Sequence, residues 1–337
     1  MSQLPNTSNE ELIKAFQTFF PLTKDLVNYL MDVLDMELEP VYQRIRSQIP
    51  FSFEEVCKIT IDLDLSIDKL IGLKDGTIAY FDLELYRATD LEGLFKEIFI
   101  SNAEMLYMLR MANSPLIYSV LNRLPFCYTL QEETMCKYYF YKACYRAQKE
   151  KATISFKDFK VPEEILEQCR RHMNEYDMIS GKIIIIMDEN LLLYMIREME
   201  HFYKIGLLSD TDMDELQQTL TRVADQMEYT IRSGTNRGGA EIQTYLSTID
   251  IEPSYMYTEY DNKTWVQFWS PSSEMVRTSN PVFTARKKAW IESLLECTTL
   301  ITHCNEMLQS SFFARQREHI ANMFNKENKI IAESTIM

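Results

Sequence analysis

The chain has 337 residues, more than twice the roughly 150 of a typical domain, so we expect two domains. Hydrophobic residues make up 46% and charged residues 25%, which is ordinary for a folded protein and excludes a chain that is disordered throughout. Only 8 glycines and 10 prolines are available for turns, which excludes a barrel or sandwich of many short strands and favours helices.

The formal net charge is −15, so the long-range field of the protein repels nucleic acid and anionic lipid unless basic residues gather locally. The 7 cysteines are spread along the chain without a CxxC pair, which is typical of free thiols in a reducing cytosol. The N-terminal residues are polar and acidic, and apolar windows such as 183–187 are too short to cross a bilayer. We therefore expect a cytoplasmic protein with no membrane contact.

Short helices are predicted throughout the first 72 residues. Capping boxes at Ser8 with Glu11 and at Ser52 with Glu55 mark two helix starts, and Pro21 ends the first helix. The five expected helices cover about residues 10–19, 23–34, 38–46, 52–63 and 66–72. Residues 73–88 contain Gly76 and little helical periodicity, so the predicted domains are residues 1–76 and 77–337.

The second domain is expected to consist mostly of long helices. They are predicted over residues 91–111, 134–151, 162–175, 189–205 and 211–232, and as a pair over 284–323. Between residues 243 and 270, aromatic and β-branched residues surround a turn at Asp261–Asn262, which indicates a small β-hairpin or sheet. The predicted fold class is mainly α: a five-helix helix-turn-helix domain followed by a larger helical domain with a short β segment.

The second and third helices are separated by about three residues, the spacing of a helix-turn-helix, whose second helix can lie in the major groove of DNA. Val41 and Ile45 are four residues apart and are expected to face inward. Glutamine and arginine can read adenine and guanine edges, while tyrosine and arginine can hold phosphates. The candidate DNA-binding residues on the outer face and at its flank are Leu38, Glu39, Tyr42, Gln43, Arg44 and Arg46.

The tract Val41-Tyr-Gln-Arg-Ile-Arg-Ser-Gln-Ile-Pro-Phe-Ser-Phe-Glu-Glu, followed by Leu63-Asp-Leu-Ser-Ile-Asp-Lys-Leu-Ile-Gly, resembles the Xre (lambda-repressor-like) helix-turn-helix regulators. It is most similar to a branch whose recognition helix reads Ala/Val-Tyr-Arg-Arg-Ile/Leu-Arg-Gly-Glu. The resemblance covers residues 10–72, about a fifth of the chain. It implies the five-helix fold and a transcription regulator that binds double-stranded DNA.

Three positions depart from that family, and the charge favours a second hypothesis. Asp35 stands where the family often has glycine in the turn, Glu37 replaces a small polar cap, and Ser47 replaces the glycine after the recognition helix. Residues 1–76 hold seven lysines and arginines against thirteen aspartates and glutamates, a net charge of −6 that is unfavourable for binding DNA. The alternative is an interaction or scaffold protein whose degenerate helix-turn-helix binds protein.

Other motifs predict little chemistry. The sequence has no nucleophile elbow, phosphate loop, dinucleotide glycine fingerprint or HExxH, so we do not expect an enzyme. Cys297, His303 and Cys304 lack a fourth ligand nearby, so no metal or cofactor is expected. His172 and His201 stand alone in the sequence and are interpreted as surface or core residues.

A palindromic DNA site is bound by two helix-turn-helix units, one on each half-site, so DNA binding predicts a homodimer. The larger domain is expected to form the dimer or to sense an effector, a small molecule or a peptide.

Overall fold

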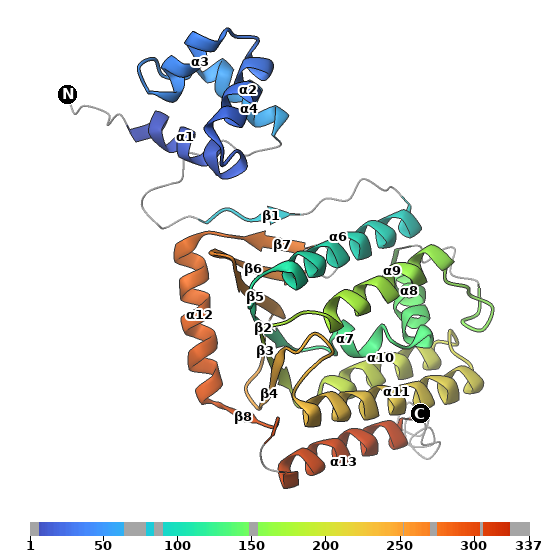
Figure 1. The fold of residues 1–337 in the computed structure, drawn as a ribbon. Helices are drawn as coiled ribbons and strands as arrows, with labels where there is room; N and C mark the ends of the chain where they lie inside the picture. Colours follow the sequence, from blue (N-terminus) through green and yellow to red (C-terminus); the bar gives the residue numbers. More distant parts are fainter. Residues whose placement is uncertain are drawn as a thin grey trace, which may run out of the picture. The chain divides into compact units, whose positions relative to one another are not determined.

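The structure, a computed structural model, describes residues 7–63, 79–83, 90–147, 154–251, 253–269, 275–303 and 306–323. The chain divides into two compact units, unit 1 (Met1–Tyr80) and unit 2 (Phe81–Met337) (Figure 1). The predicted junction after residue 76 and the predicted helix over residues 66–72 both lie outside the described residues.

Unit 1 is built from short helices around one small apolar core. Its described helices are α1 (Thr7–Phe19), α2 (Thr23–Leu34), α3 (Leu38–Ile45) and α4 (Phe53–Asp62). The fully buried side chains are Phe16, Leu26, Leu30, Val41 and Ile59. The expected capping box at Ser52 and Glu55 is confirmed at the start of α4, whereas the side chains of Ser8 and Glu11 lie outside the described ones.

Unit 2 is an α/β domain. The described strands are β1 (Asp82–Leu83), β2 (Leu116–Leu121), β3 (Lys182–Asp188), β4 (Glu241–Ser247), β5 (Tyr255–Tyr260), β6 (Lys263–Trp269), β7 (Met275–Thr278) and β8 (Thr298–Leu300). Within the described residues they form one eight-stranded sheet in the order β1-β7-β6-β5-β2-β3-β4-β8. The central strands β2, β3 and β4 are parallel, and the flanking pairs are antiparallel.

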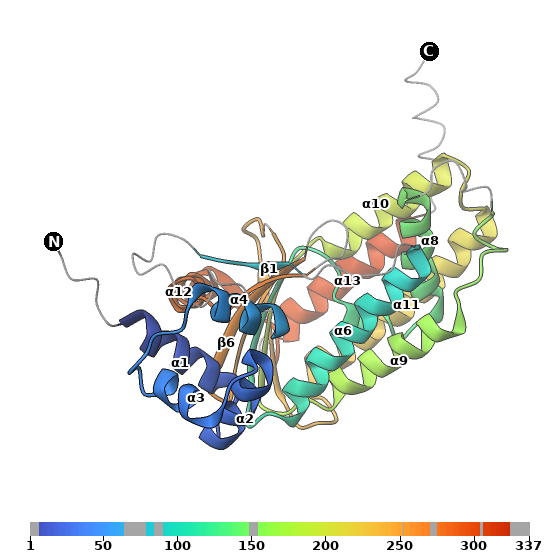
Figure 2. The ribbon, with the colours of Figure 1, turned by 90° about the horizontal axis from the view of Figure 1, so that it is seen from above.

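Helices cover both faces of this sheet. They are α6 (Leu91–Met111), α7 (Phe126–Thr129), α8 (Glu133–Ala147), α9 (Glu163–Asp177), α10 (Leu191–Lys204), α11 (Asp210–Ser233), α12 (Pro281–Glu296) and α13 (Glu306–Asn322). Figures 1 and 2 show α12 on one face and the other long helices on the opposite face. Alternate residues of β2 and β3 enter the two cores: Ile117 and Ile185 pack toward the larger helical layer, whereas Tyr118 and Ile186 pack toward α12.

The predicted fold class, mainly α with a small β segment, is therefore wrong. The expected strands at 243–270 are present as β4, β5 and β6, and Asp261 and Asn262 both have positive φ, as a tight hairpin turn requires. However, these strands belong to a sheet whose parallel strands β2 and β3 were not predicted. β3 is apolar on both faces and β2 nearly so, with Ser119 as the exception, and their sequences lack the alternation that marks a half-exposed strand.

The long helices agree with the sequence prediction. Helix α6 has the expected bounds, and α9, α10 and α11 differ from them by a few residues. The turn between α10 and α11 carries the capping box of Ser209 and Asp212. The predicted pair over residues 284–323 is correct for α12 and α13, but β8 lies between them.

Gly181 sits where the sheet begins and the backbone approaches itself closely. Its φ is +82°, and a Cβ placed there would lie 2.3 Å from the carbonyl oxygen of Pro115. That same oxygen accepts a hydrogen bond from the Lys182 N–H at 2.9 Å, and the Gly181 carbonyl accepts from the Glu241 N–H at 2.8 Å. The contact thus aligns the starts of β2, β3 and β4.

We predict that Gly181→Ala destabilises unit 2 more than Gly206→Ala does. Gly206 also has a positive φ, +78°, but no atom lies within 4 Å of an added Cβ. Gly206→Ala should therefore lower the free energy of unfolding only by the cost of holding alanine in the left-handed conformation, about 1–2 kcal/mol. The clash with Pro115 should add about 1–3 kcal/mol in Gly181→Ala. Urea unfolding followed by tryptophan fluorescence measures both variants. Equal losses would contradict the role of the close approach.

Candidate functional site

Helices α2 and α3 of unit 1 are consecutive and are separated by three residues. Asp35 ends α2 in the left-handed conformation, with φ 51°, and the Met36 N–H donates to the Met31 carbonyl at 3.1 Å. An aspartate can adopt this conformation, so the turn forms without glycine. Val41 is fully buried and Ile45 is half-buried against the same core, in agreement with the predicted helix phase.

Most of the predicted DNA-binding residues lie away from the buried Val41, although Tyr42 also packs in part against the core of unit 1. Leu38, Glu39 and Arg46 are exposed, while Tyr42 and Gln43 are half-buried. The Arg46 guanidinium carbon lies 5.1 Å from the centroid of the Tyr42 ring, a cation–π distance. This contact holds the Arg46 side chain beside the exposed end of α3.

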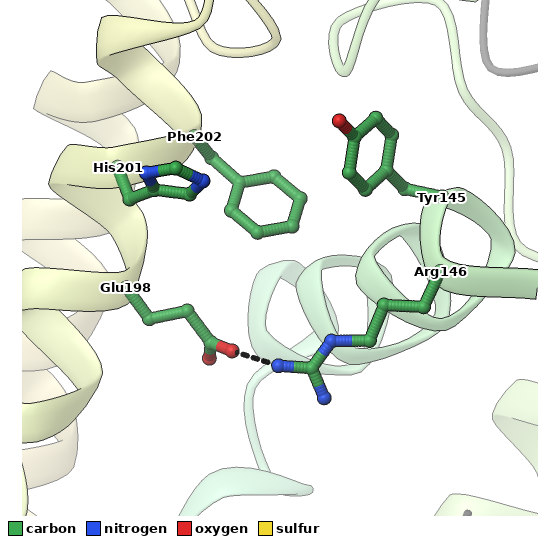
Figure 3. A pocket seen from close by; sticks show the side chains of 5 residues that line it. All are labelled: Tyr145, Arg146, Glu198, His201 and Phe202. Atoms are coloured by element: carbon green, nitrogen blue, oxygen red, sulfur yellow. Dashed lines mark hydrogen bonds and ion pairs between the residues drawn. The ribbon is translucent and has the colours of Figure 1, made fainter. Parts of the chain in front are cut away.

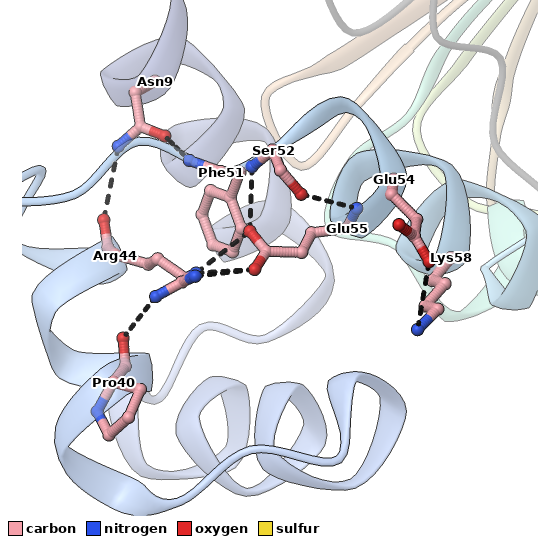
Figure 4. Close-up of polar contacts among 8 residues, drawn as sticks. All are labelled: Asn9, Pro40, Arg44, Phe51, Ser52, Glu54, Glu55 and Lys58. Atoms are coloured by element: carbon pink, nitrogen blue, oxygen red, sulfur yellow. Dashed lines mark hydrogen bonds and ion pairs between the residues drawn. The ribbon is translucent and has the colours of Figure 1, made fainter.

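Arg44 is separated from this group by its own contacts (Figure 4). Its Nη2 donates to Glu55 Oε1 at 2.7 Å and its Nε donates to Glu55 Oε2 at 3.0 Å. Its Nη1 donates to the Pro40 carbonyl at 3.3 Å. With the side chains of Arg44 and Glu55 only 16% and 12% exposed, this ion pair joins α3 to α4.

The ion pair changes the acidity of both groups. The hydrogen bond to Glu55 raises the pKa of Arg44 although burial opposes it. Burial disfavours the charged form of Glu55, but hydrogen bonds from Arg44 and Ser52 outweigh it and hold the pKa of Glu55 below its usual value. Glu55 therefore serves both the capping box and the ion pair as a carboxylate.

Asn9 of α1 is a further anchor that the sequence analysis missed. Its Oδ1 accepts from the Phe51 N–H at 3.0 Å, and its Nδ2 donates to the Arg44 carbonyl at 3.3 Å and to Ser47 Oγ at 3.0 Å. Ser47 has a φ of 55°, so the chain turns sharply there. The Asn9 side chain thereby fixes the end of α3 (Figure 4).

In the part of the chain that the structure describes, no group of three histidine, cysteine, aspartate or glutamate side chains could hold a metal ion. Cys297 is exposed, and Cys304 lies outside the described residues. None of the described helices combines the length and the apolar character needed to cross a membrane.

Compared with protein-family models, with curated proteins and with solved structures, the chain has no match.

We predict that acid weakens unit 1 through Glu55. Its pKa is lower in the folded protein than the usual 4.5, so its stabilisation is complete above pH 4.5 and is lost as the pH falls through the folded value. Glu55→Gln should lower the stability of α3 and α4 at neutral pH by about 1–3 kcal/mol and remove most of the pH dependence. Hydrogen exchange of peptides from residues 38–62, corrected for intrinsic rates, measures this.

Glu54→Gln is the matched control. Glu54 is the neighbouring residue in the same helix turn, but its side chain is 83% exposed and lies 3.8 Å from Lys58. Removing this charge should change stability by a few tenths of a kcal/mol, about the worth of a surface pair. Glu54→Gln should keep the pH dependence of the wild type. If Glu55→Gln keeps it as well, the ion pair does not have the role assigned to it.

Proposed function

We propose that this chain is a cytoplasmic transcription regulator that binds double-stranded DNA through α3. The observation that supports this most is the placement of α3: it follows α2 after three residues, and its inner side is fixed by Arg44, Glu55 and Asn9. Tyr42 and Gln43, which are half-exposed, and the exposed Arg46 that follows α3 can reach base edges or phosphates. The described cysteines form no disulfide, as is usual in a reducing compartment.

The outer residues of α3 offer distinct contacts. Gln43 can bond adenine on two atoms, and Arg46 can bond guanine or a phosphate. Glu39 can accept from the amino group of cytosine, and Leu38 can contact a thymine methyl. Arg44 is assigned a supporting role, because its donors already bond Glu55 and Pro40. An anchored helix keeps its side chains in one geometry and so loses less entropy on binding.

A second candidate function is protein docking by unit 1. Two apolar side chains of α4, Phe53 and Ile61, are 76% and 80% exposed. The formal net charge of residues 1–76 is negative. Exposed apolar groups are common at protein interfaces, whereas negative charge opposes DNA.

We predict that Arg46→Ala weakens binding to a duplex selected from a random-sequence library by about 1–3 kcal/mol, since one base or phosphate contact is lost. Lys58→Ala on α4 is the control: it removes the same charge from unit 1 but outside α3. Fluorescence anisotropy at two salt concentrations measures both, and binding should weaken as salt rises. If no duplex is selected, or if Arg46→Ala and Gln43→Ala bind like the wild type, the docking function is favoured.

We also predict a homodimer in solution. A unit with a negative net charge gains little from phosphates, so tight binding requires two units on adjacent half-sites. Light scattering of the full chain should give twice the mass of one chain. A monomer that nevertheless selects DNA would show that a single α3 suffices.

A further inference from the structure

Unit 2 contains a cavity of about 150 Å³ between α6 and the sheet. Its walls are largely apolar and include several aromatic rings, among them Phe95 and Phe99 of α6, Phe126 of α7 and Trp269 of β6. The floor is the inner face of β2, where Ile117, Ser119 and Leu121 point to the same side. Ligand pockets are typically lined in this way, with few polar groups among apolar ones.

One of those polar groups is His172 of α9, which has no partner at Nδ1 among the described residues. The side chain is 7% exposed, and the rings of Phe99 and Phe126 meet its imidazole edge-on at 6.4 Å. Burial lowers the pKa of His172 to about 4, so the ring is neutral at pH 7, with one nitrogen that donates and one that accepts. Nδ1 is closed to a water-sized molecule, so the ring nitrogen left for a ligand in the cavity is Nε2, which donates or accepts according to the tautomer.

The cavity lies where sheets of this kind bind ligands. Leu121 and Arg123 at the carboxyl end of β2 line it, together with Ser254 at the start of β5. β2 pairs with parallel β3, and ligands of open α/β sheets usually bind in crevices outside the carboxyl ends of such strands. Arg123 both lines the cavity and is exposed on the surface, so the cavity opens to solvent at that end.

We propose that this cavity binds a small aromatic molecule that carries one hydrogen-bonding group, such as a hydroxyl, and that this group pairs with His172. The volume sets the size, because an apolar cavity of about 150 Å³ holds a benzene ring. The aromatic walls suit a flat ring by edge-to-face contacts. This inference goes beyond DNA binding by α3, since it concerns unit 2 alone.

A second pocket, of about 360 Å³ between α8 and α10, is a poorer candidate (Figure 3). Its carboxylate, Glu198, already accepts from Arg146 at 2.7 Å and from Lys142 at 2.8 Å. The charged groups of this pocket thus satisfy one another. The exposed His201 at its rim provides a control histidine for the test.

Calorimetric titration of the full chain with phenol and with benzene tests the proposal. The wild type should bind phenol at least tenfold more tightly than benzene, which is about 1.4 kcal/mol. In His172→Phe and in His172→Leu, phenol should lose this advantage to within about twofold, since the hydrogen bond is gone. His201→Ala should keep the tenfold preference.

Ser119→Met tests the location, because a longer side chain on β2 would fill the cavity and should weaken both probes at least tenfold. Circular dichroism verifies that each variant folds, and His172→Phe should melt no lower than the wild type because it removes an unpaired polar group. The proposal is overturned if the wild type binds neither probe, if both His172 variants keep the preference for phenol, or if Ser119→Met binds like the wild type. None of these measurements depends on DNA, so the two proposals fail separately.

Discussion

The burial of β2 and β3 on both faces is the constraint on which unit 2 depends. Their side chains pack into two separate cores, so helices must cover both sides of the sheet. The crossovers between β2, β3 and β4 supply most of the larger layer, and α12 supplies the other. The close approach of Gly181 to Pro115 sets the register of the three parallel strands, and the cavity lies at the opposite, carboxyl end of β2. The strands that organise the core of unit 2 thus also form the floor of its cavity.

The sequence predicts the helices better than the sheet for a physical reason. Amphipathic helices such as α9 and α11 carry an apolar stripe with a period that no strand shares. A strand buried on both faces has no such period, so the run Ile183–Met187 was interpreted only as an apolar window. The strands from β4 to β6 were recognised because the hairpin turn Asp261–Asn262 interrupts residues of high β propensity.

The sequence predicted most of the residues of α3 that face the core, but it did not predict the contacts that α3 makes. The four-residue spacing of Val41 and Ile45 predicted their inward positions correctly, but Tyr42, which was predicted to face outward, also packs in part against the core. The partner of Arg44 is eleven residues away and Asn9 is more than thirty residues away, so no local pattern joins them. His172 stands alone in the sequence, and its surroundings are made by α6 and α7, which only the fold brings together. Local patterns fix where a side chain points, whereas its partners depend on the tertiary structure.

The two edges of the sheet have a consequence for self-association. Within the described residues the edge strands are very short, with two residues in β1 and three in β8. A short edge strand presents few unpaired backbone donors and acceptors, so another chain gains little by adding a strand there. The described edges of the sheet therefore offer little backbone for edge-to-edge pairing in spite of the large apolar sheet. Two copies that associate stably would do so through side chains on the helical layers, where a specific surface can be selected without opening a route to fibres.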